Sequence, residues 1–180
     1  MEKTALAGGP TQDEIMAVSL YKLAIRHGDV IFDIGCGTGK VAIAMAGRAG
    51  KVYAVDRRPE AIACAQDAAE KAGVKNIEFF CGGAADFLAT APVADSAFVG
   101  GSQQIEVFLP LLAQKVRKTI VVNAVLVATL ATVTDAMQAL GIFSEAVHVQ
   151  VARSHPLGKS FMFVPIDPVY IIVGRGTACS

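Results

Sequence analysis

A glycine-rich turn, with an aspartate about 20 residues further on, constrains the fold of this chain more than any other feature. The turn comprises residues 33–39 (DIGCGTG) and follows a short apolar run, as Asp56 follows a second one. Glycines let a backbone turn sharply and let a ligand approach it closely. The turn opens a helix, whose free N–H groups attract anionic groups, and a carboxylate at Asp56 is placed to bind the two hydroxyls of a ribose. The order strand, turn, helix, strand, acid therefore predicts a cofactor site rather than a tight turn alone.

Strand-like and helix-like segments alternate along most of the chain. Strands are expected at 30–32, 52–55, 77–80, 96–99 and 119–125, and helices at 12–24, 41–49, 59–72, 103–116 and 127–140. Residues 11–14 (TQDE) form a capping-box pattern at the start of the first helix. Two more strands are expected at 147–151 and 169–173, joined by a linker at 152–168 that is rich in proline.

This pattern predicts one α/β domain, residues 1–180, with a Rossmann-like architecture. Alternating strands and helices indicate a mostly parallel seven-stranded sheet with right-handed crossovers and helices on both faces. One strand of the terminal pair is expected to be antiparallel, which is common on such sheets. Within the domain we expect an N-terminal helical segment at 1–27, βα units at 28–142 and the terminal strand pair at 143–180.

Charged residues are scarce and balanced. They make up 18% of the chain, where about 25% is usual, and hydrophobic residues make up 53%. So few charges cover a monomer poorly, and we expect a homo-oligomer with an apolar interface. Lysine and arginine equal aspartate and glutamate at 16 each, and a neutral chain argues against a nucleic-acid partner.

No segment predicts secretion, a membrane span or a metal centre. The N-terminus lacks the apolar core of a signal peptide, and the longest uncharged stretch, 119–134, is shorter than the roughly 20 apolar residues of a membrane span. The four cysteines form no CxxC pair, so we expect no metal site and reduced thiols in a cytoplasmic enzyme.

The glycine spacing decides which cofactor is expected. Dinucleotide sites usually show G-x-G-x-x-G, whereas this chain has G-x-G-x-G preceded by an aspartate. That pattern resembles the first motif of class I S-adenosylmethionine-dependent methyltransferases. The resemblance implies that the turn holds the methionine end of S-adenosyl-L-methionine, that the acid after the second strand holds its ribose, and that backbone groups near residue 84, where the family often has Gly-Asp-Ala, contact adenine. The candidate cofactor-binding residues are Thr11, Asp33, Gly35, Cys36, Gly37, Thr38, Gly39, Asp56, Arg57 and Ala84.

Four further segments narrow the resemblance. Residues 10–14, 99–102, 121–125 and 151–158 are similar to the small decarboxylating precorrin methyltransferases of cobalamin biosynthesis. The resemblance implies methylation of carbon 15 of a cobalt-precorrin, loss of carbon dioxide from its ring-C acetate, and a homotetramer. It also makes Gly101, Ser102 and Asn123 candidates for substrate binding. From the residues alone, Ser102 could equally cap a helix and Asn123 could cap the backbone.

A tetrapyrrole that carries many carboxylates needs fixed positive charge around its pocket. The segment after the sixth strand contains Arg153, His155 and Lys159, and 161–163 (FMF) adds apolar surface. If that strand is parallel, its following loop reaches the edge of the sheet where ligands bind. We hypothesise that this loop closes over the substrate, with Arg153 clamping a carboxylate; the alternative is an ordinary solvated loop.

The sequence names no catalytic acid or base. The methyl donor is already activated, and an electron-rich tetrapyrrole carbon needs positioning more than proton transfer. The alternatives are a methyltransferase for another small molecule or for a protein carboxylate, a nicotinamide dehydrogenase, which the glycine spacing disfavours, and a non-catalytic subunit that keeps the fold.

Overall fold

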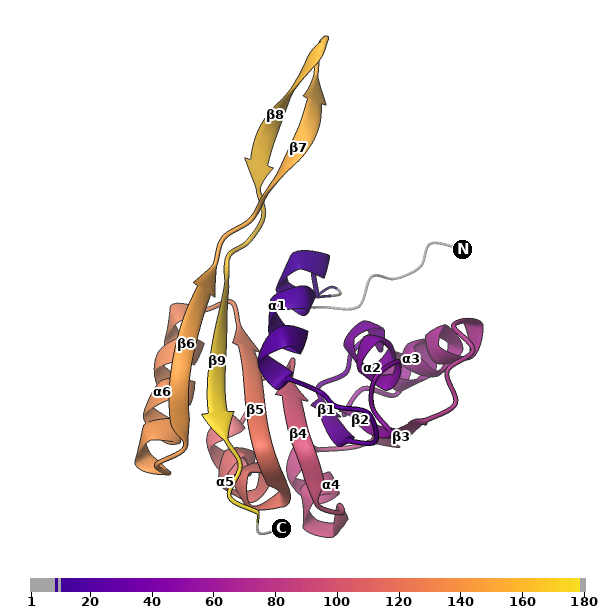
Figure 1. Ribbon diagram of the computed structural model, residues 1–180, viewed down its shortest axis with the longest axis vertical. Coiled ribbons are helices and arrows are strands. Elements are labelled where there is room, and N and C mark those ends of the chain that lie inside the picture. Colours follow the sequence, from indigo (N-terminus) through magenta and orange to yellow (C-terminus); the bar gives the residue numbers. More distant parts are fainter. Residues whose placement is uncertain (1–8, 10, 179–180) are drawn as a thin grey trace.

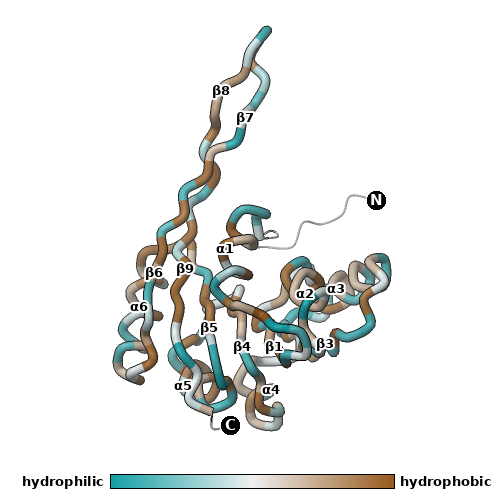
Figure 2. The backbone as a smooth tube through the Cα atoms, viewed as in Figure 1, coloured by the Kyte–Doolittle hydropathy of each residue, from teal (hydrophilic) through white to brown (hydrophobic). Residues whose placement is uncertain are grey.

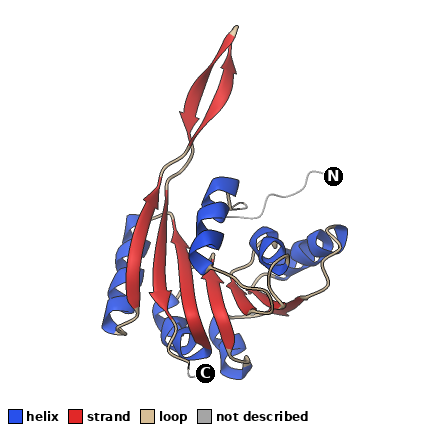
Figure 3. Ribbon diagram, in the orientation of Figure 1, coloured by secondary structure: helices blue, strands red, loops and turns tan. Residues whose placement is uncertain are grey.

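The computed structural model describes residues 9 and 11–178, and its centre is a seven-stranded sheet in the order β3-β2-β1-β4-β5-β9-β6 (Figures 1 and 3). The sheet strands are β1 (Val30–Ile34), β2 (Lys51–Asp56), β3 (Ile77–Cys81), β4 (Ala94–Val99), β5 (Val116–Ala124), β6 (Phe143–Val149) and β9 (Val169–Arg175). β1 to β5 pair in parallel, and β9 is antiparallel to both of its neighbours, β5 and β6. The predicted mostly parallel sheet with one antiparallel strand is therefore confirmed.

Helices cover both faces of this sheet, as predicted. They are α1 (Asp13–Leu23), α2 (Lys40–Ala46), α3 (Pro59–Lys71), α4 (Ala84–Thr90), α5 (Ile105–Lys115) and α6 (Val127–Ala139). Alternate residues of a strand point to opposite faces, and the buried side chains accordingly form two clusters. Ile31 packs with α1, α2 and α3 on one face, and Phe32 packs with α4, α5 and α6 on the other.

The first helix starts differently from the prediction. Its N-cap is Gln12, which makes no side-chain capping hydrogen bond, so the expected capping box at 11–14 is wrong. The helix begins one residue later than the pattern requires, which places Glu14 at the second helical position rather than the third. The Glu14 side chain pairs instead with Arg153, far away in the sequence.

Two elements were not expected from the sequence. α4 is a helix of 7 residues that follows Gly83, and one short alanine-rich turn carries little periodic signal. The proline-containing segment expected as a linker is a hairpin of β7 (Ala152–Leu157) and β8 (Ser160–Pro165), turning at Gly158 with φ 58°. The terminal region therefore contains a strand pair of the sheet and, between its members, this second hairpin.

The β7–β8 hairpin extends away from the rest of the molecule (Figure 1). Polar residues predominate in β7 and apolar residues in β8 (Figure 2), and Leu157, Phe161, Met162 and Phe163 are largely exposed. An isolated two-stranded hairpin is marginally stable in water. This one leaves apolar side chains uncovered by the described part of its own chain.

Candidate functional site

A cavity of about 1170 Å³ lies at the carboxyl ends of the central strands. Its walls come from the glycine turn after β1, the end of β2, the start of α4, the segment after β4, the chain before α1 and the start of β9. In parallel α/β sheets, ligands bind at this edge, where the strand order reverses between β1 and β4. The cavity is therefore the candidate site.

Gly35 makes the sharp turn at the end of β1. Its φ is 77°, and a Cβ there would lie 2.7 Å from the backbone N of Gly101. The N–H groups of Gly35 and Cys36 both donate to the Val55 carbonyl, at 2.8 and 2.9 Å. The turn is thus held between β2 and the segment after β4. Residues 35–38 line the cavity, a position consistent with the predicted cofactor turn.

The third glycine of the motif has a different place. Gly39 has φ 79°, and a Cβ there would lie 2.8 Å from the Cβ of Ala65 in α3. It is not among the residues that line the cavity. Its absent side chain allows α2 and α3 to pack closely, and its predicted cofactor contact remains a prediction.

Asp33 carries a carboxyl group without a local partner. Its side chain is fully buried, and neither carboxylate oxygen has a hydrogen-bond partner among the residues that the structure describes. Burial and, to a smaller extent, the nearby charge of Asp56 raise the pKa of Asp33 to about 7. Asp33 lines the cavity, so a cation bound there could supply the missing partner.

Asp56, at the end of β2, is in the opposite situation. Its carboxylate accepts hydrogen bonds from the backbone N–H of Gly37 and of Arg58, and from the Arg58 side chain, all at 3.0 Å. Burial alone would raise the pKa of Asp56, but these hydrogen bonds outweigh it and hold the pKa below its ordinary value. Asp56 lines the cavity together with the exposed Arg57.

The segment after β3 contributes a carboxylate that the sequence interpretation missed. Gly83 and Ala84 line the cavity, and the predicted contact of Ala84 with adenine remains a prediction. Asp86, in the first turn of α4, also lines it, and its Oδ2 lies over Gly83, 2.9 Å from where a Cβ would be. The family's aspartate would fall at residue 83, which is glycine in this chain, and α4 brings in a carboxylate from three residues further on.

Lys40 was also missed, although it directly follows the glycine turn. Its Nζ donates to the Thr11 carbonyl at 2.7 Å and pairs with Asp13 at 2.7 Å. This contact ties the segment before α1 to the start of α2. Thr11 lies in the wall of the cavity, and its predicted cofactor contact remains a prediction.

Of the substrate-side candidates after β4 and β5, two line the cavity. Gly101 and Asn123 do so, whereas Ser102 does not. Gln104, not Ser102, is the N-cap of α5. The Ser19 hydroxyl of α1 lies 3.1 Å from Oδ1 of Asn123, while Nδ2 of Asn123 is buried with no partner in the described part of the chain.

The predicted basic loop lies away from this cavity. Arg153, His155 and Lys159 belong to β7 and the hairpin turn, and none of them lines the cavity of its own chain. Arg153 forms a bidentate ion pair with Glu14 of α1, with Nε to Oε1 at 3.0 Å, and this pair lowers the pKa of Glu14 to about 2. β6 is parallel, as the hypothesis required, but the chain continues from it into a projecting hairpin instead of a covering loop.

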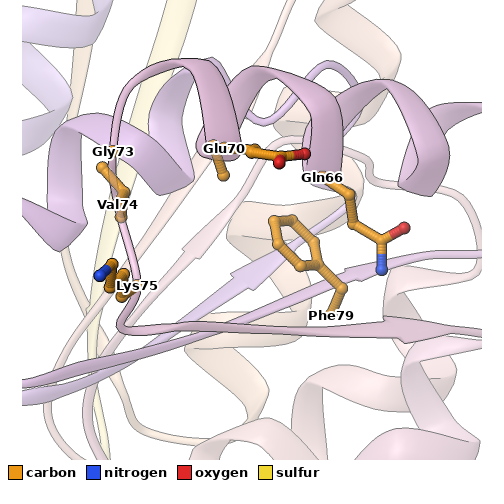
Figure 4. Close-up of a pocket in the computed structure, with 7 residues that line it drawn as sticks. Gln66, Glu70, Gly73, Val74, Lys75 and Phe79 are labelled. Atoms are coloured by element: carbon orange, nitrogen blue, oxygen red, sulfur yellow. The ribbon is translucent and has the colours of Figure 1, made fainter.

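A second hollow, of about 370 Å³, lies between the end of α3 and the start of β3 (Figure 4). Phe79 and Gln66 face it from the strand and the helix, with Glu70 and Lys75 at its sides. It is at the amino end of β3, opposite the edge where the glycine turn lies. It brings no reactive group toward the large cavity.

The described residues contain no group of three His, Cys, Asp or Glu side chains that could hold a metal ion. Within the same part of the chain, no helix has the length and apolar character needed to cross a membrane.

Comparison with known proteins identifies relatives along nearly the whole chain. Residues 5–174 match the precorrin methyltransferase domain family. A protein of Methanosarcina acetivorans named probable cobalt-precorrin-6B C(15)-methyltransferase (decarboxylating) is 42% identical over 98% of this chain and 99% of its own length. A protein of the same name from Methanosarcina mazei is 42% identical over 97% of both chains.

Solved structures agree with these relatives. A crystal structure of precorrin 8W decarboxylase from Methanobacterium thermoautotrophicum superposes with a TM-score of 0.89, at 32% identity over 92% of this chain and 91% of that one. A precorrin-6Y C5,15-methyltransferase from Geobacter metallireducens gives 0.89 at 28% identity, over 95% of this chain and 93% of that one.

Proposed function

The chain belongs to the precorrin methyltransferase family, and we propose that it methylates carbon 15 of cobalt-precorrin-6B and removes carbon dioxide from the ring-C acetate. The observation that carries this proposal is the 42% identity, over 98% of the chain, to a relative named for that reaction. The enzyme is thus a decarboxylating C-methyltransferase of cobalamin biosynthesis.

The residues of the cavity fit S-adenosylmethionine as the methyl donor. That cofactor would supply a methyl group activated on a sulfonium, together with an ammonium, a carboxylate and a ribose diol. The carboxyl of Asp33 lacks a partner and would pair with the ammonium, and the turn at 35–38 offers backbone N–H groups at a helix start for the carboxylate. Asp56 would accept from the diol, and Asp86, which lines the cavity together with Ala84, would accept from the adenine amine.

The substrate half of the cavity offers apolar side chains together with polar ones, among them Asn123. Val107 of α5 and Val125 after β5 are 63% and 56% exposed and line the cavity. A broad tetrapyrrole would rest on these side chains, and the carboxamide of Asn123 would give it an orientation. The task of these residues is to hold the ring carbon in line with the donor methyl, and to keep water from the acetate that leaves as carbon dioxide.

We also propose that the protein is a homo-oligomer, a tetramer in view of its family, and is located in the cytoplasm. Support for self-association comes from the exposed apolar side chains of the β7–β8 hairpin, which the described part of its own chain leaves uncovered. Support for a reducing compartment comes from the free thiols of Cys36, Cys64 and Cys81.

The direct test is a reaction of the purified protein with S-adenosylmethionine and cobalt-precorrin-6B, followed by mass spectrometry of the corrinoid. We expect a product that has gained one methyl group and lost one carbon dioxide. Asp56→Ala is the matched control and should give little product at the same cofactor concentration. Failure to methylate any corrin precursor, with methyl transfer to another small molecule, would refute the substrate and leave the cofactor standing.

A further inference from the structure

The carboxylate that would bind the ribose is already fully hydrogen-bonded. A carboxylate has about four acceptor positions. In Asp56 they are taken by four donors, namely the backbone N–H groups of Gly37 and Arg58 and the Nε and Nη2 groups of the Arg58 side chain. The Asp56 side chain is only 5% exposed, so these four protein donors, rather than solvent water, fill its acceptor positions.

The Arg58 side chain lies on the ligand side of this carboxylate. Arg58 lines the cavity, and its Nη2 lies 3.9 Å from the point where a Cβ of Gly37 would be, so the guanidinium extends across the glycine turn. The two backbone donors belong to the glycine turn and to the N-cap of α3, and they cannot leave without a change in the backbone there. The Arg58 side chain, which is 30% exposed, is the part that can move.

From this geometry we propose that Arg58 occupies the ribose subsite of the ligand-free enzyme and competes with the cofactor for Asp56. The inference rests on the proposed use of an adenosine cofactor. Two ribose hydroxyls need two acceptor positions on Asp56. These positions become available only when the hydrogen bonds from Nε and Nη2 of Arg58 break. Binding therefore exchanges two N–H···O bonds for two O–H···O bonds.

The exchange has a consequence that a purely structural ion pair would not have. The Arg58–Asp56 pair holds the pKa of Asp56 down and that of Arg58 up, so it stabilises the ligand-free protein. The same pair opposes the ligand. Removal of the Arg58 side chain should lower the melting temperature of the ligand-free protein and at the same time tighten cofactor binding.

The test is isothermal titration of the full-length protein with S-adenosylmethionine and with S-adenosylhomocysteine. We expect Arg58→Ala to bind both about three- to tenfold more tightly than the unaltered protein, a modest gain because the pair is partly exposed and screened by solvent. Arg58→Lys keeps the charge without the bidentate fork and should fall between the two. Arg48→Ala, an exposed arginine at the opposite edge of the sheet, is the matched control for loss of one positive charge and should leave both affinities unchanged.

The possible outcomes separate the two proposals. Equal or weaker binding by Arg58→Ala, while the unaltered protein binds both compounds, overturns the role of Arg58 and leaves the cofactor in place. Failure of the unaltered protein to bind either compound overturns the cofactor itself. A crystal structure with S-adenosylhomocysteine adds a direct readout, since Nε and Nη2 of Arg58 should then lie beyond hydrogen-bond distance of Asp56; retention of both bonds in the complex would also overturn the inference.

Discussion

Two aspartates at neighbouring strand ends differ because of what surrounds them. Asp33 is buried with no donor at hydrogen-bond geometry among the described residues, and burial raises its pKa despite the nearby backbone N–H of Ala42, which lowers it, whereas Asp56 receives four donors and its pKa is lowered. Burial of an ionised carboxylate without a hydrogen-bond partner costs free energy. A cation bound in the cavity would supply a partner for the Asp33 carboxylate and offset that cost. At the scale of single residues, the site is prepared for a positively charged ligand at one end and is self-occupied at the other.

The raised pKa of Asp33 makes cofactor binding pH-dependent. Near pH 7 the carboxyl is partly protonated, and an ammonium beside it favours the ionised form. We therefore expect binding of S-adenosylmethionine at or below pH 7 to release a proton, and the affinity to rise as the pH approaches that value. Calorimetry in two buffers of different ionisation enthalpy measures the release, and Asp33→Asn should abolish it. Equal proton release by both proteins would contradict the assignment.

The raised pKa of Asp33 also predicts how the unfolding free energy changes with pH. Because the folded state holds the proton of Asp33 more tightly than the unfolded chain, the unfolding free energy should fall as the pH rises from about 4 to about 7 and level off above. Asp33→Asn should lack this component of the fall. Urea unfolding of the two ligand-free proteins across that range measures the difference.

At the scale of elements, close contacts between helices and loops place the site. Gly39 lets α2 lie against α3, Lys40 ties α2 to the chain before α1, and Arg153 ties the hairpin to α1. Each tie joins elements that come from different parts of the chain. The wall of the cavity therefore depends on packing as much as on the glycine turn itself.

The packing role of Gly39 can be separated from its backbone conformation by a matched glycine. Gly39 and Gly73 both have positive φ, but a Cβ at Gly73 would meet nothing within 4 Å. Gly73→Ala should cost only the left-handed conformation, about 1–2 kcal/mol. Gly39→Ala should cost about 1–3 kcal/mol more, because its Cβ would overlap Ala65. Urea unfolding compares them, and equal losses would show that the contact with α3 is not limiting.

The ion pair between Arg153 and Glu14 holds the base of the hairpin. We expect Arg153→Ala and Glu14→Gln to increase amide hydrogen exchange in β7 and β8 to a similar extent, with little further increase in the double variant. The pKa of Glu14 is lowered to about 2 in the folded protein. The ion pair therefore contributes fully to folding stability above pH 4.5, the ordinary pKa of a glutamate, and this contribution is lost as the pH falls toward 2.

The proposed clamp on a substrate carboxylate predicts a different pattern. In that case Arg153→Ala alone, and not Glu14→Gln, should raise the KM for the tetrapyrrole by about tenfold, the effect of one charge-assisted contact. Cofactor affinity should stay unchanged in both variants. Measurement of KM and of hydrogen exchange on the same proteins therefore distinguishes the two roles of Arg153, namely an ion pair that holds the hairpin to α1 and a contact with a substrate carboxylate.

At the scale of the whole molecule, the β7–β8 hairpin projects from a compact α/β body. The described part of the chain leaves apolar side chains of this hairpin exposed. Phe161 and Phe163 are 61% and 64% exposed, and their rings pack edge to face at 5.8 Å. Exposed apolar patches of this kind mark interaction sites. The low proportion of charged residues, 18% of the chain, also favours an apolar interface between subunits.

Self-association through the hairpin is open to a direct test. Light scattering of the unaltered protein should report an oligomer, and Phe161→Ser with Phe163→Ser should shift it to smaller species. Tyr21→Ser removes a side chain that is 79% exposed on α1 and should leave the assembly unchanged. A monomer at every working concentration, before any substitution, would refute the proposed assembly.

The alternation of strands and helices, the cofactor turn and the acid after β2 could all be predicted from the sequence, because each depends on neighbouring residues. Apolar periodicity reports which face of an element is buried, and glycine supplies the positive φ that Gly35 adopts. The mostly parallel sheet followed from the alternation of strands and helices, whereas the order of its strands came only from the structure. The four further segments that resemble a known family led to the substrate.

Contacts between distant residues could not be predicted in this way. Arg153 and Glu14 are 139 positions apart, and nothing local shows that a guanidinium expected on a substrate carboxylate is paired with a helix. The hairpin is stabilised by pairing between β7 and β8 across a segment whose prolines indicate a linker. Asp86 enters the cavity only because α4 forms there, and the Arg58 side chain takes acceptor positions on Asp56 that the pattern assigned to a ribose. These features depend on which side chains folding brings within hydrogen-bond distance, and no local propensity encodes that.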